Sequence, residues 1–463
     1  MFEFMPVWDS ASKEPLYMQL YRFLKLEIQC GRIKAGARLP SKRKLAVHLG
    51  ISKNTIEAAY QQLDAEGYVD CQPRKGIFVK EMEEGIYPGR VKKPVRPISR
   101  TEEYKIDFSH GRVDVSHFPF SKWRRLNQQL QFQDEGDYLH VGHPQGELPL
   151  REEIAEYLFQ SRGVICSSEQ IIIGAGIQYL LGMLHVTLGK ECLYAMENPG
   201  FHRVRTTLEG HGLIVESIPL DEQGIRIQPL YDKCVDVVYV TPSHQFPTGT
   251  IMPISRRNEL LRWADRTKGY IIEDDYDSEF RYAGKPIPAL QGLNETERVI
   301  YLGTFSKSFI PSIRLSYMVL PGHLMEEYQT RLNMYKQTVS RITQVALAAF
   351  MKEGDWNRHL NRMRNVYRRK QKILITAINR HMGDRVTIIG EKSGLHILLQ
   401  VHSGQSESCL IELAKGRSIK IYPTSIYHTG GGRGNPAVLL GFGGLSEEEI
   451  ETGIRGLAEI WFG

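Results

Sequence analysis

The chain has 463 residues, of which 41% are hydrophobic and 24% are charged, and a net charge of +6. Its length and apolar content are typical of a soluble globular protein with two or three domains. The six cysteines are scattered singly, without a C-x-x-C pair or the spacing of a zinc site. The start "MFEFMPVWDS" lacks a secretory signal, and polar residues interrupt the most apolar window, residues 171–188. We therefore expect a cytoplasmic protein with reduced thiols, no metal site and no membrane span.

The positive charge is concentrated near the start of the chain. Residues 1–80 contain 13 Lys and Arg against 8 Asp and Glu, so this segment carries a net charge of +5. A small basic domain on a near-neutral body suggests a polyanionic partner, although a solvated charged surface would explain the same count.

The first 80 residues show the pattern of three helices followed by two strands. Apolar residues recur at helical spacing within residues 15–33, 41–50 and 52–67. Ser41 and Ser52 can cap the second and third helices. The stretch "YVDCQPRKGIFVK" then predicts two short strands around a basic turn. This order predicts a winged helix-turn-helix.

Short polar and cationic residues stand where such a domain contacts DNA. The first turn of the recognition helix meets base edges and phosphates, and the start of the preceding helix meets phosphates. Any one of these residues alone would be read as a cap or a solvated surface residue, but together they predict binding to double-stranded operator DNA. The candidates are Ser41, Lys42 and Arg43, then Ser52, Lys53, Asn54 and Thr55, and Arg74 and Lys75 in the turn.

The stretch "RLPSKRKLAVHLGISKNTIEAAYQQLDAEGYVDCQPRKGIFV" resembles the GntR family of bacterial regulators over nearly the whole N-terminal domain. The resemblance implies DNA contacts by Arg43, by residues 52–55 and by Gly76 of the wing.

Beyond the first 80 residues the composition changes twice. Residues 81–104 are rich in proline, glycine and charge, which predicts a linker. In residues 105–463, strands such as "VDVVYV", "YIIED", "RVIYL" and "LSYMVL" alternate with helical stretches, and a smaller α+β segment begins near Arg385. We expect an α/β multidomain protein with domains at 1–80 and 105–463, the second built on a mostly parallel sheet between helices.

The stretch "YLGTFSKSFIPSIRLSY" places Lys307 between two serines and seven residues before an arginine. A neutral lysine amine attacks an aldehyde to give a Schiff base, and pyridoxal 5'-phosphate (PLP) is the commonest aldehyde held this way. PLP needs a carboxylate at its pyridine nitrogen, a donor at its ring oxygen, an aromatic platform and a phosphate cradle. The candidates are Asp274 and Tyr276 in "YIIEDDYDSEF", Phe201 in "ENPGFHR", the turn Gly174, Ala175 and Gly176, and Ser306 and Arg314 beside the lysine.

Each of these signals also has an ordinary explanation. An acidic strand end can bind magnesium beside a nucleotide, but no G-x-x-x-x-G-K-[ST] loop is present. Lys307 alone would most often be a surface lysine, and "GAG" alone is a weak turn signal. The order of glycine turn, aromatic residue, acidic strand end, lysine and arginine favours PLP.

That order resembles the fold type I aminotransferases from about Ile106 to the end of the chain. The whole chain resembles the MocR subfamily of GntR regulators, in its GabR-like form, through "HPQG", "YAMENPG", "TPSHQFPTGTIMPISRR", "IIEDDYDSEF" and "GTFSKS". The resemblance implies a head-to-tail homodimer. It also implies Lys307 as the Schiff-base lysine, Asp274 on the pyridine nitrogen, Tyr276 on the ring oxygen, Phe201 stacking, and Gly176, Ile177, Ser306 and Arg314 around the phosphate.

Two positions depart from the family pattern. Phe246 in "HQFPTG" stands where working aminotransferases usually have asparagine, so we expect at most weak transamination. The stretch "IYPTSIYH" lacks the arginine that grips an amino acid carboxylate, and Ile426 stands in its place. Arg203, together with Arg433 in "GGGRG", is the remaining candidate grip for an effector.

The function expected from these signals is that of a PLP-binding transcription regulator whose effector is PLP itself, with a role in vitamin B6 supply. One alternative is an amine or amino acid effector held by Arg203 and Arg433. Others are an aminotransferase with an accessory DNA domain, and a repressor whose large domain serves only for dimerisation.

Overall fold

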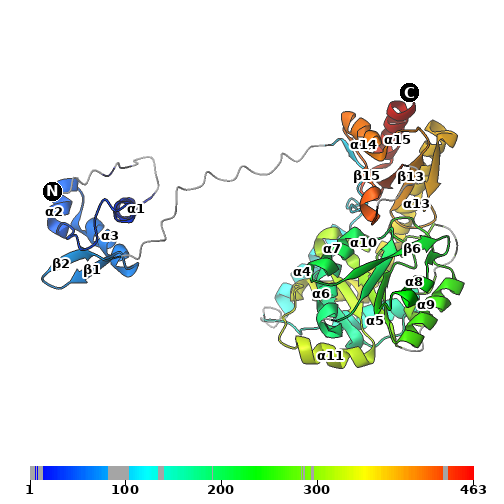
Figure 1. The fold of residues 1–463 in the computed structure, drawn as a ribbon, viewed down its shortest axis with the longest axis horizontal. Coiled ribbons are helices and arrows are strands. Elements are labelled where there is room, and N and C mark those ends of the chain that lie inside the picture. Colours follow the sequence, from blue (N-terminus) through cyan, green and yellow to red (C-terminus); the bar gives the residue numbers. More distant parts are fainter. Residues whose placement is uncertain are drawn as a thin grey trace. The chain divides into compact units, whose positions relative to one another are not determined.

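The computed structural model describes residues 6, 8, 14–81, 104–133, 140–189, 191–282, 284, 287–293, 297–430 and 436–463 (Figure 1). The chain divides into two compact units, Met1–Thr101 and Glu102–Gly463, and each is described by itself. Most of the predicted linker, 82–103, lies outside the described residues.

The N-terminal unit is a winged helix-turn-helix, as the sequence predicted. Its core is a single cluster in which Leu20, Leu24, Ile56 and Leu63 are fully buried. Gly50 ends the second helix in the left-handed conformation, at φ 65°. The elements of this unit are α1 (Leu16–Gln29), α2 (Lys42–Leu49), α3 (Lys53–Ala65), β1 (Val69–Gln72) and the antiparallel β2 (Gly76–Val79).

The large unit is built on a mixed sheet. Its strand order is β4 (Ile171–Gly174), β11 (Ser316–Val319), β10 (Val299–Thr304), β9 (Tyr270–Asp275), β8 (Val237–Val240), β5 (Tyr194–Asn198), β6 (Val215–Asp221) and β7 (Gly224–Ile225). The run from β10 to β6 is parallel, whereas β11 is antiparallel to both of its neighbours. The segment between β10 and β11 is too short for the crossover that a parallel pair needs.

Helices cover both faces of this sheet. The described helices of the large unit are α4 (Phe120–Gln133), α5 (Leu148–Arg162), α6 (Ile177–Leu188), α7 (His202–Gly210), α8 (Gln228–Asp232), α9 (Ile254–Thr267), α10 (Phe305–Ser308), α11 (Gly322–Leu332), α12 (Arg341–Lys352), α13 (Asp355–His381), α14 (Glu407–Gly416) and α15 (Glu447–Phe462). Successive strand residues point to opposite faces. Tyr301 accordingly packs in the cluster that contains α5 and α12, while Ile300 and Leu302 pack with α6, α7 and α11.

A smaller α+β lobe follows α13, as the sequence predicted (Figure 1). Its antiparallel strands are β12 (Val386–Ile389), β13 (His396–Val401), β16 (Ala437–Gly441) and β15 (Tyr422–Pro423), and the short β14 (Ile419–Lys420) pairs with β3 (Ile106–Asp107). One core cluster joins these strands to α13, α14 and α15.

The parallel strands fix where polar side chains gather. Because β5, β8, β9 and β10 are adjacent and run in the same direction, the segments that follow them meet at one edge of the sheet. Those segments carry Phe201, His244, Tyr276 and Lys307. Among the described residues, no helix is long and apolar enough to cross a membrane.

Candidate functional site

Lys307 lies in α10, directly after β10, and is partly buried. Burial lowers its pKa from 10.5 to about 8, an effect that nearby Arg203 increases and Asp277 opposes. The ammonium donates a hydrogen bond to the carbonyl oxygen of His110. A lysine with a pKa near 8 is about one-tenth neutral at pH 7, far more than a lysine with the ordinary pKa, and the neutral amine is the form that attacks an aldehyde.

Asp274 lies near the carboxyl end of β9 and is only 2% exposed. One carboxylate oxygen accepts a hydrogen bond from the hydroxyl of Tyr239 on β8, and the other has no hydrogen-bond partner among the described residues. Burial raises the pKa of Asp274 to about 7, against the opposing effect of the Tyr239 hydrogen bond. The unpartnered oxygen therefore suits a cationic donor from a ligand.

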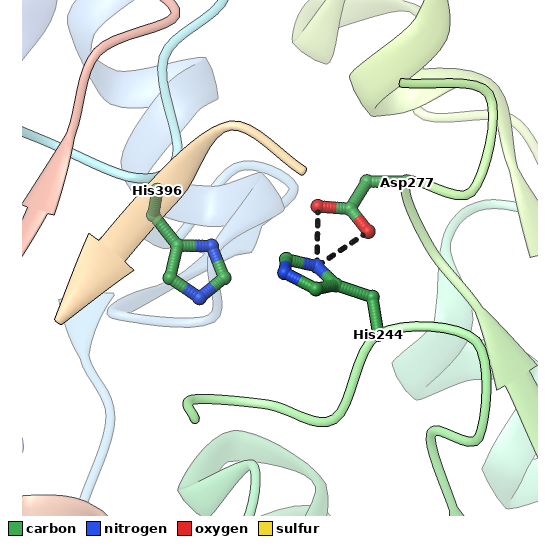
Figure 2. Close-up of side chains that lie close together, drawn as sticks. All are labelled: His244, Asp277 and His396. Atoms are coloured by element: carbon green, nitrogen blue, oxygen red, sulfur yellow. Dashed lines mark hydrogen bonds and ion pairs between the residues drawn. The ribbon is translucent and has the colours of Figure 1, made fainter. Parts of the chain in front are cut away.

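Tyr276 adjoins a buried imidazole. Its hydroxyl oxygen lies 2.9 Å from Nδ1 of His244 and 3.0 Å from the carbonyl oxygen of the same residue. Nδ1 also lies 3.0 and 3.2 Å from the two carboxylate oxygens of Asp277 (Figure 2). Burial, reinforced by the charges of Asp277 and Asp274, raises the pKa of Tyr276 well above its ordinary value, so the phenol keeps its proton.

An aromatic cluster lines the same edge. The ring of Phe246 is 3% exposed, and its centroid lies 4.8 Å from that of Phe201 and 4.9 Å from that of Tyr427. It also meets Tyr276 edge to face, with the centroids 6.1 Å apart. The position where working aminotransferases usually have an asparagine is therefore filled by the buried apolar ring of Phe246.

The glycine turn joins β4 to α6. Gly176 has φ +99°, and a Cβ at this position would lie 2.5 Å from a terminal nitrogen of Arg314, so only glycine lets the guanidinium cross the start of the helix. The N–H of Ala175 donates to the hydroxyl of Thr338, and that of Gly176 donates to Gly174. The backbone donors that remain for a ligand therefore belong to the first turn of α6, from Ile177 onward.

The other residues predicted around the cofactor and effector are placed as follows. Ser306 is partly exposed beside Lys307, and its N–H donates to the Thr304 hydroxyl. Arg203 is exposed in the first turn of α7. Ile426 is 47% exposed and lines a small cavity of about 20 Å³ next to Phe201. Arg433 lies outside the described residues.

The candidate DNA contacts are brought to two helix starts and one turn. Arg43 and residues 52–54 are exposed, and Arg74 and Lys75 are exposed in the turn between β1 and β2. Some of the candidates also have partners within the unit. Ser52 accepts from the N–H of Thr55, and their hydroxyls lie 2.9 Å apart.

The remaining three candidates, Ser41, Lys42 and Gly76, also have structural roles within the N-terminal unit. Ser41 caps α2 by accepting from the N–H of Lys44, and Lys42 forms an ion pair of 2.7 Å with Glu57 of α3. Gly76 has φ +130°, and a Cβ there would lie 2.6 Å from the Nε of Arg38.

Sequence reasoning missed five polar residues of the sheet-edge site, namely Tyr239, His244, Asp277, Thr338 and His396. His244 and Asp277 stand inside motifs that the sequence made prominent, "SHQFPTG" and "DDYDSEF", so their proximity to motif positions was an available signal. No local signal links Thr338 to the glycine turn, because it is 163 residues from Ala175.

Three of the buried side chains could supply ligand atoms for a metal ion. One atom each of His244, Asp277 and His396 lies within 4.8 Å of the others. Figure 2 shows His244 between the other two side chains. His244 Nδ1 faces the Asp277 carboxylate, and His396 Nε2 lies 3.2 Å from the carbonyl oxygen of Pro247. Hydrogen bonds account for Nδ1 of His244 and Nε2 of His396, whereas Nε2 of His244 has no hydrogen-bond partner among the described residues.

Comparison with known proteins identifies the family. A family model for "Bacterial regulatory proteins, gntR family" matches residues 16–79, and one for "Aminotransferase class I and II" matches residues 103–455. The chain is 33% identical to the probable rhizopine catabolism regulatory protein MocR of Rhizobium meliloti, over 98% of this chain and 95% of that protein. The chain belongs to the MocR-like subfamily of GntR-family transcriptional regulators.

Two further relatives of this MocR-like chain have full-length matches. It is 47% identical to the uncharacterized HTH-type transcriptional regulator YdeL of Bacillus subtilis, over 96% of this chain and 97% of the relative. It is 30% identical to the HTH-type pyridoxine biosynthesis transcriptional regulator PdxR of Corynebacterium glutamicum, over 93% of both proteins.

The large unit also resembles solved aminotransferases. The multiple substrate aminotransferase of Thermococcus profundus superposes with a TM-score of 0.70 at 23% identity, over 78% of this chain and 92% of that chain. These comparisons confirm the predicted family and the predicted fold.

Proposed function

We propose that this MocR-like regulator binds PLP at the sheet edge through Lys307 and passes the binding state to its winged helix. The observation that carries the proposal is the unpartnered carboxylate oxygen of Asp274, buried at the same edge as Lys307. A buried carboxylate oxygen without a partner is costly, and a pyridinium N–H would satisfy it.

The remaining side chains also fit PLP. The first turn of α6 offers backbone donors and a positive helix end, and Arg314 crosses that start where Gly176 leaves room. Phe201 and Phe246 provide aromatic surface within the same cluster. These features support a phosphate cradle and a platform for the ring.

PLP would supply an aldehyde for the lysine amine and a ring that stabilises charge. The protein's own residues do the rest. Lys307 provides the neutral amine, because its surroundings hold its pKa at about 8. Asp274, which accepts a hydrogen bond from Tyr239, would hold the ring nitrogen, and Tyr276, whose phenol stays protonated, would donate to the ring oxygen.

We propose PLP itself as the signal. An amino acid effector would need a strong cationic partner for its carboxylate. Arg203 is exposed, and Ile426 stands where the family pattern has a second arginine. A ligand that carries a phosphate is better served by α6 and Arg314. The name of the relative PdxR, a pyridoxine biosynthesis regulator, agrees with a role in vitamin B6 supply.

Steady transamination is not part of the proposal. Phe246 is buried beside Tyr276 and cannot hydrogen-bond a cofactor oxygen, so the contact that asparagine makes in working aminotransferases is lost. An amine effector held by Arg203 is the second candidate, and it predicts a spectral change with one amine or amino acid.

The visible absorption spectrum of the purified protein tests PLP binding. We expect that added PLP produces a protein-bound visible band and that borohydride fixes the cofactor to Lys307. A protein that stays colourless in excess PLP, or a cofactor fixed on another lysine, would contradict the proposal.

We also propose a homodimer. Val141 and Met334 are 74% and 81% exposed, and the segments that follow them touch through the hydrogen bond from Gln337 to the carbonyl of Pro144. Neighbouring exposed apolar side chains favour an interface, whereas isolated ones are ordinary on a protein surface.

Light scattering at micromolar concentration tests the dimer. Met334→Glu should shift the measured mass towards the monomer, because the substitution would bury a charge in the dimer interface. Ile214 is 68% exposed on another part of the unit, so Ile214→Glu should leave the mass unchanged. A wild-type protein that is monomeric would contradict the dimer.

A further inference from the structure

The buried pair of His244 and Asp277 has no role in the function proposed so far. Each side chain is 2% exposed, and each comes from a loop at the carboxyl end of the sheet, after β8 and β9 respectively. Figure 2 shows both carboxylate oxygens of Asp277 directed at one nitrogen of His244. A polar pair this deeply buried is costly unless its hydrogen bonds are satisfied.

Two glycines make room for the imidazole. A Cβ on Gly394 would lie 2.5 Å from His244 Nδ1 and 2.6 Å from a carboxylate oxygen of Asp277. A Cβ on Gly249 would lie 3.2 Å from His244 Nε2, and closer still, 2.5 Å, to the Cα of Gly390. Both glycines have positive φ, +75° and +71°, so the backbone of two separate segments is shaped around this ring. The imidazole is thereby held in one orientation.

The direction of the hydrogen bonds follows from the chemistry of the groups. An ionised carboxylate only accepts, so His244 carries its proton on Nδ1 when it is bonded to Asp277. The Tyr276 oxygen lies 2.9 Å from the same nitrogen, so this one proton is shared between the carboxylate and the phenol oxygen. If the phenol oxygen accepts from His244, its own O–H is free to turn from the His244 carbonyl towards a ligand.

The need for such an arrangement comes from Phe246. Its ring fills the place where a carboxamide would donate to the cofactor's ring oxygen, and it packs edge to face on Tyr276. Tyr276 is then left to make that hydrogen bond without the second donor, and its orientation matters more.

We propose that Asp277 and His244 are positioning residues that hold the Tyr276 hydroxyl as the donor to the cofactor's ring oxygen, in place of the missing carboxamide. This inference rests on the proposed binding of PLP.

Matched substitutions at His244 separate this role from simple packing. Asparagine places an amide nitrogen near the position of Nδ1, whereas glutamine places it near Nε2. His244→Asn should therefore keep the contact to Tyr276, and His244→Gln should lose it. Asp277→Asn provides a second variant of nearly unchanged size, and His185→Gln, in the buried half of α6, serves as a control for losing a buried histidine.

The readout is the pH midpoint at which the visible band of the PLP-loaded protein changes. A hydrogen bond to the ring oxygen withdraws negative charge from it, and that charge holds the proton on the neighbouring lysine-linked nitrogen. Loss of the donor should therefore raise the midpoint. We expect an increase of about one pH unit in His244→Gln and Asp277→Asn, and no change in His244→Asn or His185→Gln.

Other titratable groups face this chain of hydrogen bonds. They are Asp274, Asp275, Glu197, His110, His396 and Lys307. These groups are the same in all the His244 and Asp277 variants, so a difference between those variants does not come from replacing them. The double variant His244→Gln with Tyr276→Phe isolates the proposed route, because it should show the midpoint of Tyr276→Phe alone.

Each outcome decides between the proposals. A wild-type protein without a visible band would contradict PLP binding itself. A normal band with an unchanged midpoint in both His244→Gln and Asp277→Asn would overturn only the positioning role. Additive shifts in the double variant would do the same. Stoichiometric zinc in the PLP-loaded wild type, lost in His244→Gln, would show that the cluster is a metal site instead.

Discussion

Burial sets the chemistry of the two ionisable residues on which the proposed site depends. It lowers the pKa of Lys307 to about 8 and raises that of Asp274 to about 7. Both shifts follow from desolvation of the charged form. The sequence identified both residues, because each stands in a motif with a recognisable order. It did not indicate the shifts, which arise from segments distant in sequence, such as the loop of His110.

Lys307→Ala should abolish the visible band and any response of DNA binding to PLP, because the covalent link needs this amine. The exposed Lys352 at the end of α12 provides a control, and Lys352→Ala should behave as wild type. Absorption and fluorescence anisotropy with operator DNA measure the two effects. A PLP-dependent response that persists in Lys307→Ala would show that the lysine is dispensable.

Asp274→Asn should stabilise the cofactor-free protein at pH 8 and weaken its affinity for PLP. The folded-state pKa of Asp274 is raised to about 7, so the folded protein binds more protons than the unfolded chain between about pH 4 and 7. Stability contributed by this group therefore falls as pH rises through that window. The asparagine variant has no such dependence.

Urea denaturation at pH 5 and pH 8 measures the difference between Asp274→Asn and the wild type. The gain in the free energy of unfolding should be larger at pH 8. An equal difference at both pH values would show that burial does not raise the pKa of Asp274.

At the scale of elements, local pattern predicted much of the fold. The helical spacing and caps of residues 41–67 produced α2 and α3, with Ser41 and Ser52 at the predicted cap positions. The alternation of strands and helices predicted the sheet, but not the antiparallel direction of β11, which depends on the short connection from β10. The His244–Asp277 pair was not predicted, since it needs the loops after β8 and β9 to meet.

Arg43→Ala and Lys53→Ala should each weaken DNA binding and reduce its salt dependence by about one unit of slope, because each removes one proposed phosphate contact. The exposed Lys34, outside the two helix starts and the wing turn, provides the control. Anisotropy titrations across a series of salt concentrations give the slopes. Equal slopes of DNA affinity against salt concentration for Arg43→Ala, Lys53→Ala and Lys34→Ala would contradict a phosphate contact by Arg43 or Lys53.

At the scale of the whole molecule, the chain joins two compact units, which contain the regions that match different family models, residues 16–79 and 103–455. A ligand shifts DNA binding only if the DNA-bound and free forms of the protein differ in their affinity for it. By the same linkage, operator DNA must change the affinity of the protein for PLP by the same factor.

The most direct test is the operator affinity of the cofactor-free protein compared with that of the PLP-loaded protein at one salt concentration. We expect the two dissociation constants to differ by at least about fivefold, which corresponds to the lower end of common coupling energies. We also expect Lys307→Ala, with or without PLP, to behave as the cofactor-free wild type. Identical affinities for the two forms of the wild type would contradict the claim that PLP is the signal.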